Sequence, residues 1–91
     1  MTVARGTFEV KNKLGLHARA ATKLVQLASK FSCDIVVSRE GQEANAKSVM
    51  GVLLLCGAKG TKLDIEAKGD NAETAVTELG RLIDDRFGEG E

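Results

Sequence analysis

Apolar residues along this chain change their spacing several times, from every second position to every third or fourth. Four short segments alternate apolar and polar residues, which is typical of half-buried β-strands. These segments span residues 7–11, 34–38, 42–46 and 61–67. Residues 18–31 instead carry apolar side chains three and four positions apart, which predicts an amphipathic helix. A second amphipathic helix begins at Asp70 or Asn71, with Glu73 at capping-box spacing from Asp70.

The apolar run at residues 48–55 is too short for its spacing to decide between helix and strand. It is typical of a short helix capped by Ser48, a buried strand is the alternative, and Gly51 weakens the case for the helix. With a helix here the order of elements is βαββαβα. We therefore predict an α+β open-faced sandwich, in which a four-stranded antiparallel sheet carries three helices on one face and meets water on the other.

Composition narrows the class of protein. The chain has 91 residues, 43% of them hydrophobic, which suits a single domain over residues 1–91 with one core. Its 13 Lys and Arg balance 13 Asp and Glu, and it has three Phe but no Tyr or Trp. Nucleic-acid binding calls for a basic surface and stacking aromatics, so we do not expect it. The longest apolar run, Val52 to Cys56, is too short to cross a bilayer, and we expect a cytoplasmic protein without membrane insertion.

The two cysteines, Cys33 and Cys56, form no C-x-x-C pair, and a lone disulfide would be unusual in a reducing cytoplasm. We expect both to be buried free thiols. One His and two distant Cys do not supply the convergent ligands of a zinc site, so we expect no metal and no cofactor.

The single histidine, His17, lies between a Gly-containing turn and the first predicted helix. No Ser, Thr, Asp or Asn stands at that helix start, so we expect His17 itself at the N-cap position. The backbone N–H groups of Ala18, Arg19 and Ala20 would then face the imidazole and form a cradle for an anion, to which Arg19 adds a planar cationic fork. This combination favours transient phosphorylation of a ring nitrogen. A surface histidine that merely caps a helix is the alternative reading of the same spacing.

Other catalytic patterns are absent from the sequence. No G-x-S-x-G or comparable elbow accompanies the histidine, which argues against a hydrolytic triad. The Gly- and Lys-containing stretch at residues 57–62 lacks the spacing of a phosphate-binding P-loop and predicts a turn.

Two segments resemble the motifs of a known family. The run GLHARAA at residues 15–21 is similar to the active-site signature of HPr, the histidine-containing phosphocarrier family of the bacterial phosphoenolpyruvate:sugar phosphotransferase system. The run NAKSVMGV at residues 45–52 resembles the regulatory-serine motif of that family, at the family's separation. The resemblance covers residues 5–87 and includes the βαββαβα order.

The resemblance implies specific roles. His17 would accept a phosphoryl group on Nδ1 from phosphorylated enzyme I and pass it to an enzyme IIA domain, with Arg19 as the cation beside the phosphate. Ser48 would be the target of an HPr kinase/phosphorylase. Partner docking would use Val49, Met50 and Leu53. The chain would then be a phosphocarrier, without turnover of its own as an enzyme, and a monomer.

Two positions depart from the family pattern. Ala20 stands where most members have Pro, and Cys56 where many have a small residue such as Gly or Ala. Both Ala and Pro suit a first helical turn, so we expect activity to be retained. The Leu-Leu-Leu-Cys sequence at residues 53–56 is more typical of nitrogen-branch or regulatory relatives of HPr.

The main alternative function is a regulatory module that docks through the Ser48 surface on a transcription factor or enzyme, and the presence of His17 with Arg19 argues against it. A small-molecule enzyme is a more remote alternative, because a two-layer sandwich of this length has little room for an enclosed pocket.

Overall fold

The strands and helices follow the predicted order. The structure is a computed structural model that describes residues 2–89. Its elements are β1 (Val3–Glu9), α1 (Ala18–Ala28), β2 (Asp34–Arg39), β3 (Gln42–Asn45), α2 (Val49–Leu54), β4 (Lys62–Lys68), α3 (Ala72–Asp84) and a 3₁₀ turn, η1 (Arg86–Gly88).

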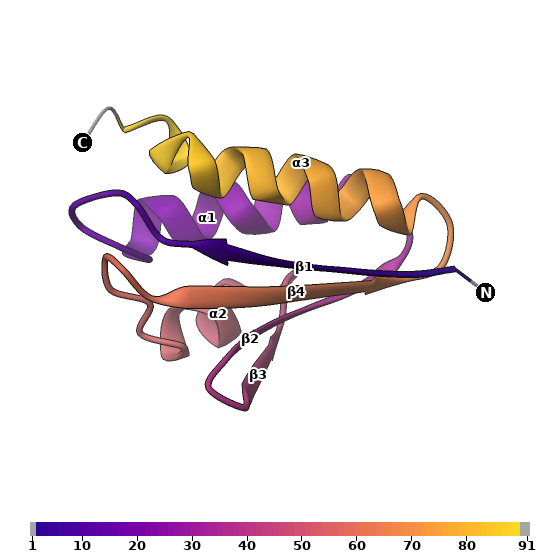
Figure 1. The fold of residues 1–91 in the computed structure, drawn as a ribbon, viewed down its shortest axis with the longest axis horizontal. Coiled ribbons are helices and arrows are strands. Elements are labelled where there is room, and N and C mark those ends of the chain that lie inside the picture. Colours follow the sequence, from indigo (N-terminus) through magenta and orange to yellow (C-terminus); the bar gives the residue numbers. More distant parts are fainter. Residues whose placement is uncertain (1, 90–91) are drawn as a thin grey trace.

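Within residues 2–89 the four strands form one antiparallel sheet in the order β1-β4-β2-β3. The alternation read from the sequence sets its two faces: Leu63, Ile65 and Ala67 of β4 are buried, while the residues between them carry charge and face outward. Helices α1 and α3 lie side by side over the apolar face, and α2 packs against α1 and β3 (Figure 1). The predicted open-faced sandwich is confirmed.

Element ends shift by a few residues from the prediction. Strand β1 begins at Val3, because its whole length pairs with β4 from Val3 opposite Lys68 to Glu9 opposite Lys62. Helix α1 ends at Ala28, three residues before the predicted end, because the chain turns at Ser29. The predicted hairpin between β2 and β3 forms with Glu40 and Gly41 both left-handed (φ 50° and 84°), the conformation that matches the twist of paired strands.

The start of α3 differs from the prediction in its chemistry. Asn71 is the N-cap, in the left-handed region at φ 62°, and no side chain caps the helix. The capping box predicted from Asp70 and Glu73 is therefore wrong. The left-handed turn at Asn71 takes the chain into the helix without the extended N-cap backbone on which a capping box depends.

The two cysteines differ from each other. Cys33 is buried at 3% exposure, as predicted, and Cys56 is exposed, so the expectation that both are buried is wrong for Cys56. Cys56 takes a left-handed φ of 53° just after the C-cap residue of α2, Leu55, and its side chain turns outward there. Among the described residues, no helix has the length and apolar character to cross a membrane.

Candidate functional site

The loop before α1 is held in place by a neighbouring loop. The Leu16 backbone N–H donates to the Gly57 carbonyl at 2.8 Å, and the Leu16 side chain is buried at 6% exposure. Gly15 has a left-handed φ of 67°, and a Cβ at this position would overlap the Gly57 carbonyl oxygen. Glycine therefore serves two purposes here, positive φ and close approach of two backbone segments, and the result is a fixed entry into α1.

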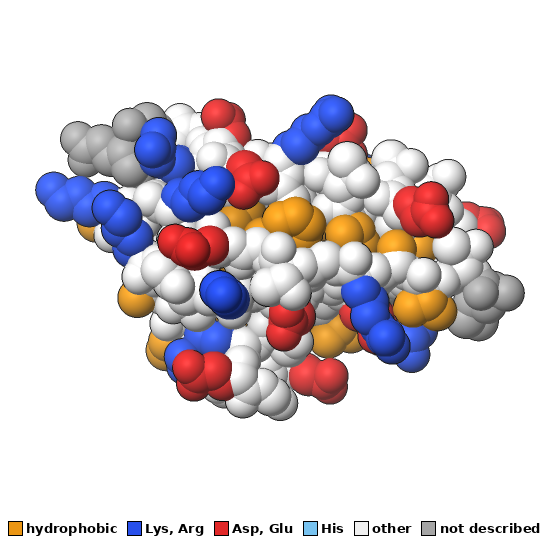
Figure 2. All heavy atoms as spheres, viewed as in Figure 1, with side chains coloured by type: hydrophobic (Ala, Val, Ile, Leu, Met, Phe, Trp, Pro, Cys, Tyr) orange, Lys and Arg blue, Asp and Glu red, His pale blue; other side chains and the backbone are white. Residues whose placement is uncertain are grey.

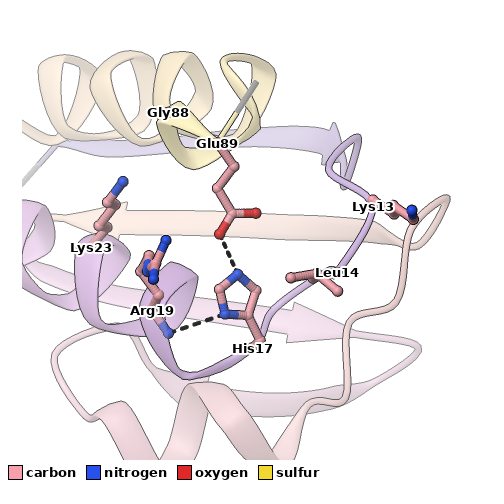
Figure 3. A pocket seen from close by; sticks show the side chains of 7 residues that line it. All are labelled: Lys13, Leu14, His17, Arg19, Lys23, Gly88 and Glu89. Carbon is pink, nitrogen blue, oxygen red and sulfur yellow. Dashed lines mark hydrogen bonds and ion pairs between the residues drawn. The ribbon is translucent and has the colours of Figure 1, made fainter. Parts of the chain in front are cut away.

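His17 is the N-cap residue of α1, as predicted. Its backbone is extended (φ −77°, ψ 177°), and its carbonyl accepts from the Ala21 N–H at 2.9 Å. The imidazole Nδ1 accepts from the Arg19 backbone N–H at 3.3 Å (Figure 3). This ring nitrogen therefore faces the first turn of α1, where a helix leaves its N–H groups without internal acceptors and where its dipole favours an anion.

The other ring nitrogen, Nε2, lies in hydrogen-bond contact with the Glu89 carboxylate (Figure 3). Glu89 belongs to the segment that follows α3, residues 85–89, which we call the C-terminal segment. Asn12 donates from Nδ2 to the second Glu89 oxygen at 2.9 Å and to the Gly15 carbonyl at 2.7 Å. The imidazole is thus held on both edges. Burial works to raise the pKa of Glu89, but the hydrogen bonds from Asn12 and His17 outweigh it and lower the pKa below its ordinary value of 4.5.

Basic side chains surround this contact. His17 and Glu89 border a hollow of about 470 Å³, together with Lys13, Arg19 and Lys23. Lys23 donates from Nζ to the Phe87 carbonyl at 2.7 Å. Lys and Arg side chains also gather at the end of the molecule where the loop after β1 and the C-terminal segment lie (Figure 2). A small hollow with three cations and a helix N-terminus is suited to a dianion such as a phosphoryl group.

The second predicted feature, Ser48, caps α2 as expected from the sequence. Its Oγ accepts from the Gly51 N–H at 3.2 Å. Of the three residues expected in a docking surface, Met50 is 70% exposed, whereas Val49 and Leu53 are partly buried against the core. The exposed residue Leu54 was missed, because a short apolar run does not reveal which of its sides is covered. Leu14, exposed in the turn before His17, lies outside that run and was also missed.

Sequence reasoning also missed Asn12 and Glu89. Asn12 is a residue type common in turns and stands in a predicted turn, so nothing marks it as part of a site. Glu89 lies 72 residues beyond His17, outside every segment with a strand or helix periodicity. Only the packing of the C-terminal segment against α1 brings them together. Among the described residues no group of three or more His, Cys, Asp or Glu side chains is placed to hold a metal ion.

Comparisons with known proteins show which family the chain is similar to. Residues 4–85 match the family described as "PTS HPr component phosphorylation site". The phosphocarrier protein HPr of Xylella fastidiosa (strain Temecula1) is 49% identical over 80 residues, covering 88% of this chain and 90% of that protein. The phosphocarrier protein NPr of Shewanella violacea is 40% identical and covers 98% of each chain.

Solved structures give the same answer for the fold. The crystal structure of HPr-C-His from Thermoanaerobacter tengcongensis superposes with a TM-score of 0.91 at 45% identity, covering 94% of this chain and 97% of that one. An HPr dimer from the same organism matches with a TM-score of 0.76 at 46% identity, covering 90% and 94%. The fold and the histidine-headed helix thus define a phosphocarrier of the phosphotransferase system. The chain belongs to the HPr family.

Proposed function

We propose that this protein carries a phosphoryl group on Nδ1 of His17, received from phosphorylated enzyme I and delivered to an enzyme IIA domain, in the cytoplasm. The observation that supports this most directly is the orientation of Nδ1 towards the first turn of α1. A phosphoryl group on that nitrogen would meet free backbone N–H groups at the helix start and the cations of the basic hollow.

The transfer needs no metal or cofactor from this chain. The Nδ1 lone pair attacks phosphorus, the new N–P bond forms, and the bond to the donor's leaving atom breaks with its electron pair kept by the donor. Arg19 and the N–H groups of Ala18 and Ala20 are the groups that we assign to the phosphoryl oxygens. These donors stabilise the charge that becomes concentrated there during transfer.

Labelling tests this proposal. The protein is mixed with enzyme I and labelled phosphoenolpyruvate, and the label on the protein is tested for the acid-labile, base-stable behaviour of a phosphohistidine. We expect one label per chain, because His17 is the chain's one histidine. His17→Ala should take up none, and Ser48→Ala should be labelled like the wild type. Label that persists on a folded His17→Ala protein would exclude the carrier function.

We also propose that Ser48 is a regulatory phosphorylation site for an HPr kinase/phosphorylase, and that Met50 with its partly buried neighbours Val49 and Leu53 contributes to docking. Support comes from the position of Ser48 at the start of α2 and from the exposure of Met50. A phosphate at Ser48 would add about two negative charges beside this apolar surface and weaken docking there.

We propose that the protein acts as a monomer, although a solved homologue is a dimer. Light scattering at the concentration used for transfer assays measures this directly, and a dimer mass would exclude it.

A further inference from the structure

We propose that Glu89, oriented by the buried side chain of Asn12, is a positioning residue that keeps a proton on Nε2 of His17 throughout phosphoryl transfer. The inference deepens the proposed function and depends on it, since it concerns how the same imidazole is prepared for reaction. It adds a role for the C-terminal segment, which the motifs at residues 15–21 and 45–52 do not include.

The hydrogen bonds define which nitrogen carries the proton. An ionised carboxylate only accepts hydrogen bonds, so Nε2 must be the donor in its contact with Glu89. A backbone N–H only donates, so Nδ1 must be the acceptor in its contact with Arg19. The two contacts lie on opposite edges of the ring and require the same tautomer. That tautomer leaves the Nδ1 lone pair available as the nucleophile.

Asn12 fixes the carboxylate that makes this choice. It is fully buried, and its Nδ2 donates to both the Gly15 carbonyl and Glu89 Oε1. Both acceptors are oxygens, so the orientation of the amide is defined. With Oε1 occupied by Asn12, Oε2 is left for the imidazole. A carboxylate that orients an imidazole and fixes its tautomer is familiar from reactive histidines, and here Asn12 orients the carboxylate in turn.

The C-terminal segment is shaped to deliver Glu89. Arg86, Phe87 and Gly88 have left-handed φ values of 55°, 54° and 75°, which turn the chain sharply after α3. The Phe87 ring is fully buried and anchors the segment, and its carbonyl accepts from Lys23 on α1. The Glu89 side chain is consequently only 11% exposed. Non-glycine residues adopt left-handed φ at a cost, so this conformation is sustained by the anchor contacts.

The surrounding charges make the carboxylate important in the phosphorylated state. When Nδ1 forms its bond to phosphorus, the proton stays on Nε2 and the ring becomes cationic. Lys13, Arg19 and Lys23 border the same hollow, and their positive charges disfavour a cationic ring. The negative charge of Glu89 stabilises the cationic ring against them. In the onward step the N–P electron pair returns to Nδ1, and the ring leaves as neutral imidazole with the Nε2 proton still in place. A single proton position therefore serves both the nucleophile and the leaving group.

Nitrogen NMR and transfer rates test the inference together. ¹⁵N-labelled histidine reports the two ring nitrogens of His17 without assignment problems, because the chain has one histidine. In the wild type we expect the Nε2–H tautomer. Glu89→Gln supplies one acceptor oxygen where two donors require two, so we expect a shift towards the Nδ1–H tautomer and about tenfold slower transfer in both directions. Glu89→Asp retains both oxygens and should recover part of the rate.

Two further variants complete the design. Asn12→Leu keeps the carboxylate but removes its orienting donor, so the tautomer should become mixed while circular dichroism shows an intact fold. Glu43→Gln removes one exposed carboxylate from β3 and is the matched control, which should leave both tautomer and rate unchanged.

The outcomes separate this inference from the proposed function. A wild-type protein that takes up no label from enzyme I would overturn the carrier function. A wild type that is labelled but shows Nδ1–H as the main tautomer would overturn the role of Glu89 alone. The same conclusion follows if Glu89→Gln matches the wild type in both tautomer and rate.

Discussion

Gly15→Ala tests whether the loop before α1 positions His17 through its contact with Gly57. Two costs add. An L-residue at φ 67° is strained by about 1–2 kcal/mol. The new Cβ would also overlap the Gly57 carbonyl oxygen, which forces the two backbone segments apart and weakens the hydrogen bond from the Leu16 N–H. Overpacking and a disturbed hydrogen bond add about 1–3 kcal/mol, so we expect a total loss of about 2–5 kcal/mol in the free energy of unfolding.

Gly41→Ala is the matched control for this prediction. Gly41 is also left-handed (φ 84°), and no atom lies within 4 Å of a Cβ built there, so this variant should show only the strain of about 1–2 kcal/mol. Urea denaturation gives both free energies of unfolding, and labelling by enzyme I gives both transfer rates. Gly15→Ala should be slower in transfer under conditions where both variants are folded. Equal destabilisation and equal transfer rates in the two variants would refute the idea that close approach to Gly57 fixes the loop.

Four further perturbations address the site and its electrostatics. Arg19→Ala should slow phosphoryl transfer about 10- to 100-fold by removing a charge-assisted contact, Arg19→Lys should recover only part of it, and rapid-quench labelling compares the three proteins. Ala20→Pro should change the free energy of unfolding by no more than about 1 kcal/mol, because Ala20 lies in the first turn of α1. Since Ala20 is fully buried, a larger loss in thermal denaturation would show that its N–H is needed or that the proline ring overpacks the core. Ser48→Asp should slow phosphoryl transfer from enzyme I while the melting temperature stays almost unchanged. Ser48→Ala should lower the free energy of unfolding by about 1 kcal/mol, because the hydrogen bond that caps α2 is lost. Normal transfer by the Asp variant would show that Ser48 acts only as a helix cap. The hydrogen bond from Arg5 at 2.5 Å outweighs the opposing effect of burial and lowers the pKa of Glu66 below 4.5. The Arg5–Glu66 pair therefore stabilises the fold above pH 4.5, and this contribution is lost as the pH falls through the folded-state pKa of Glu66. Denaturation measured at a series of acid pH values should show a shallower decline for Glu66→Gln than for the wild type, and parallel curves would contradict this.

The fold was predictable because its signals are local. Alternation along β4 puts Leu63, Ile65 and Ala67 on one face before any partner strand is known. The hairpin at Glu40 and Gly41 was equally readable, since it depends on the residues of the turn itself. Element ends were less so, because they depend on partners: β1 extends back to Val3 only because β4 is long enough to pair with it.

The two wrong predictions, a buried Cys56 and a capping box at Asp70, both failed because of the backbone conformation at one position. Cys56 is apolar and follows a run of leucines, yet its backbone leaves the helix in a left-handed conformation that turns the thiol outward. Asp70 and Glu73 have the spacing of a capping box, but Asn71 takes the N-cap position with the wrong backbone geometry for one. Apolar character and capping-box spacing, on which these two predictions relied, do not determine the backbone dihedral angles that decided both outcomes.

Half of the candidate site was predictable, because it too depends on residues that are close together in the sequence. His17 as N-cap, with Nδ1 towards the Arg19 N–H, follows from neighbours in sequence. The contact between His17 and Glu89 spans 72 positions and is made by a segment whose Phe87 ring is buried in the core. No local pattern encodes a contact of that separation.

The unequal exposure of the two cysteines makes this chain convenient for fluorescence. Cys56 offers an accessible thiol, whereas Cys33 is shielded by the core at 3% exposure, so a maleimide dye should react at one position in the native protein. That position is one residue from Gly57, whose carbonyl holds the loop that carries His17. A dye there would lie beside this loop without replacing any residue of the site. Without mutagenesis, the dye-labelled wild type therefore offers an optical test of the proposed phosphorylation of His17, as a change in fluorescence on mixing with enzyme I and phosphoenolpyruvate.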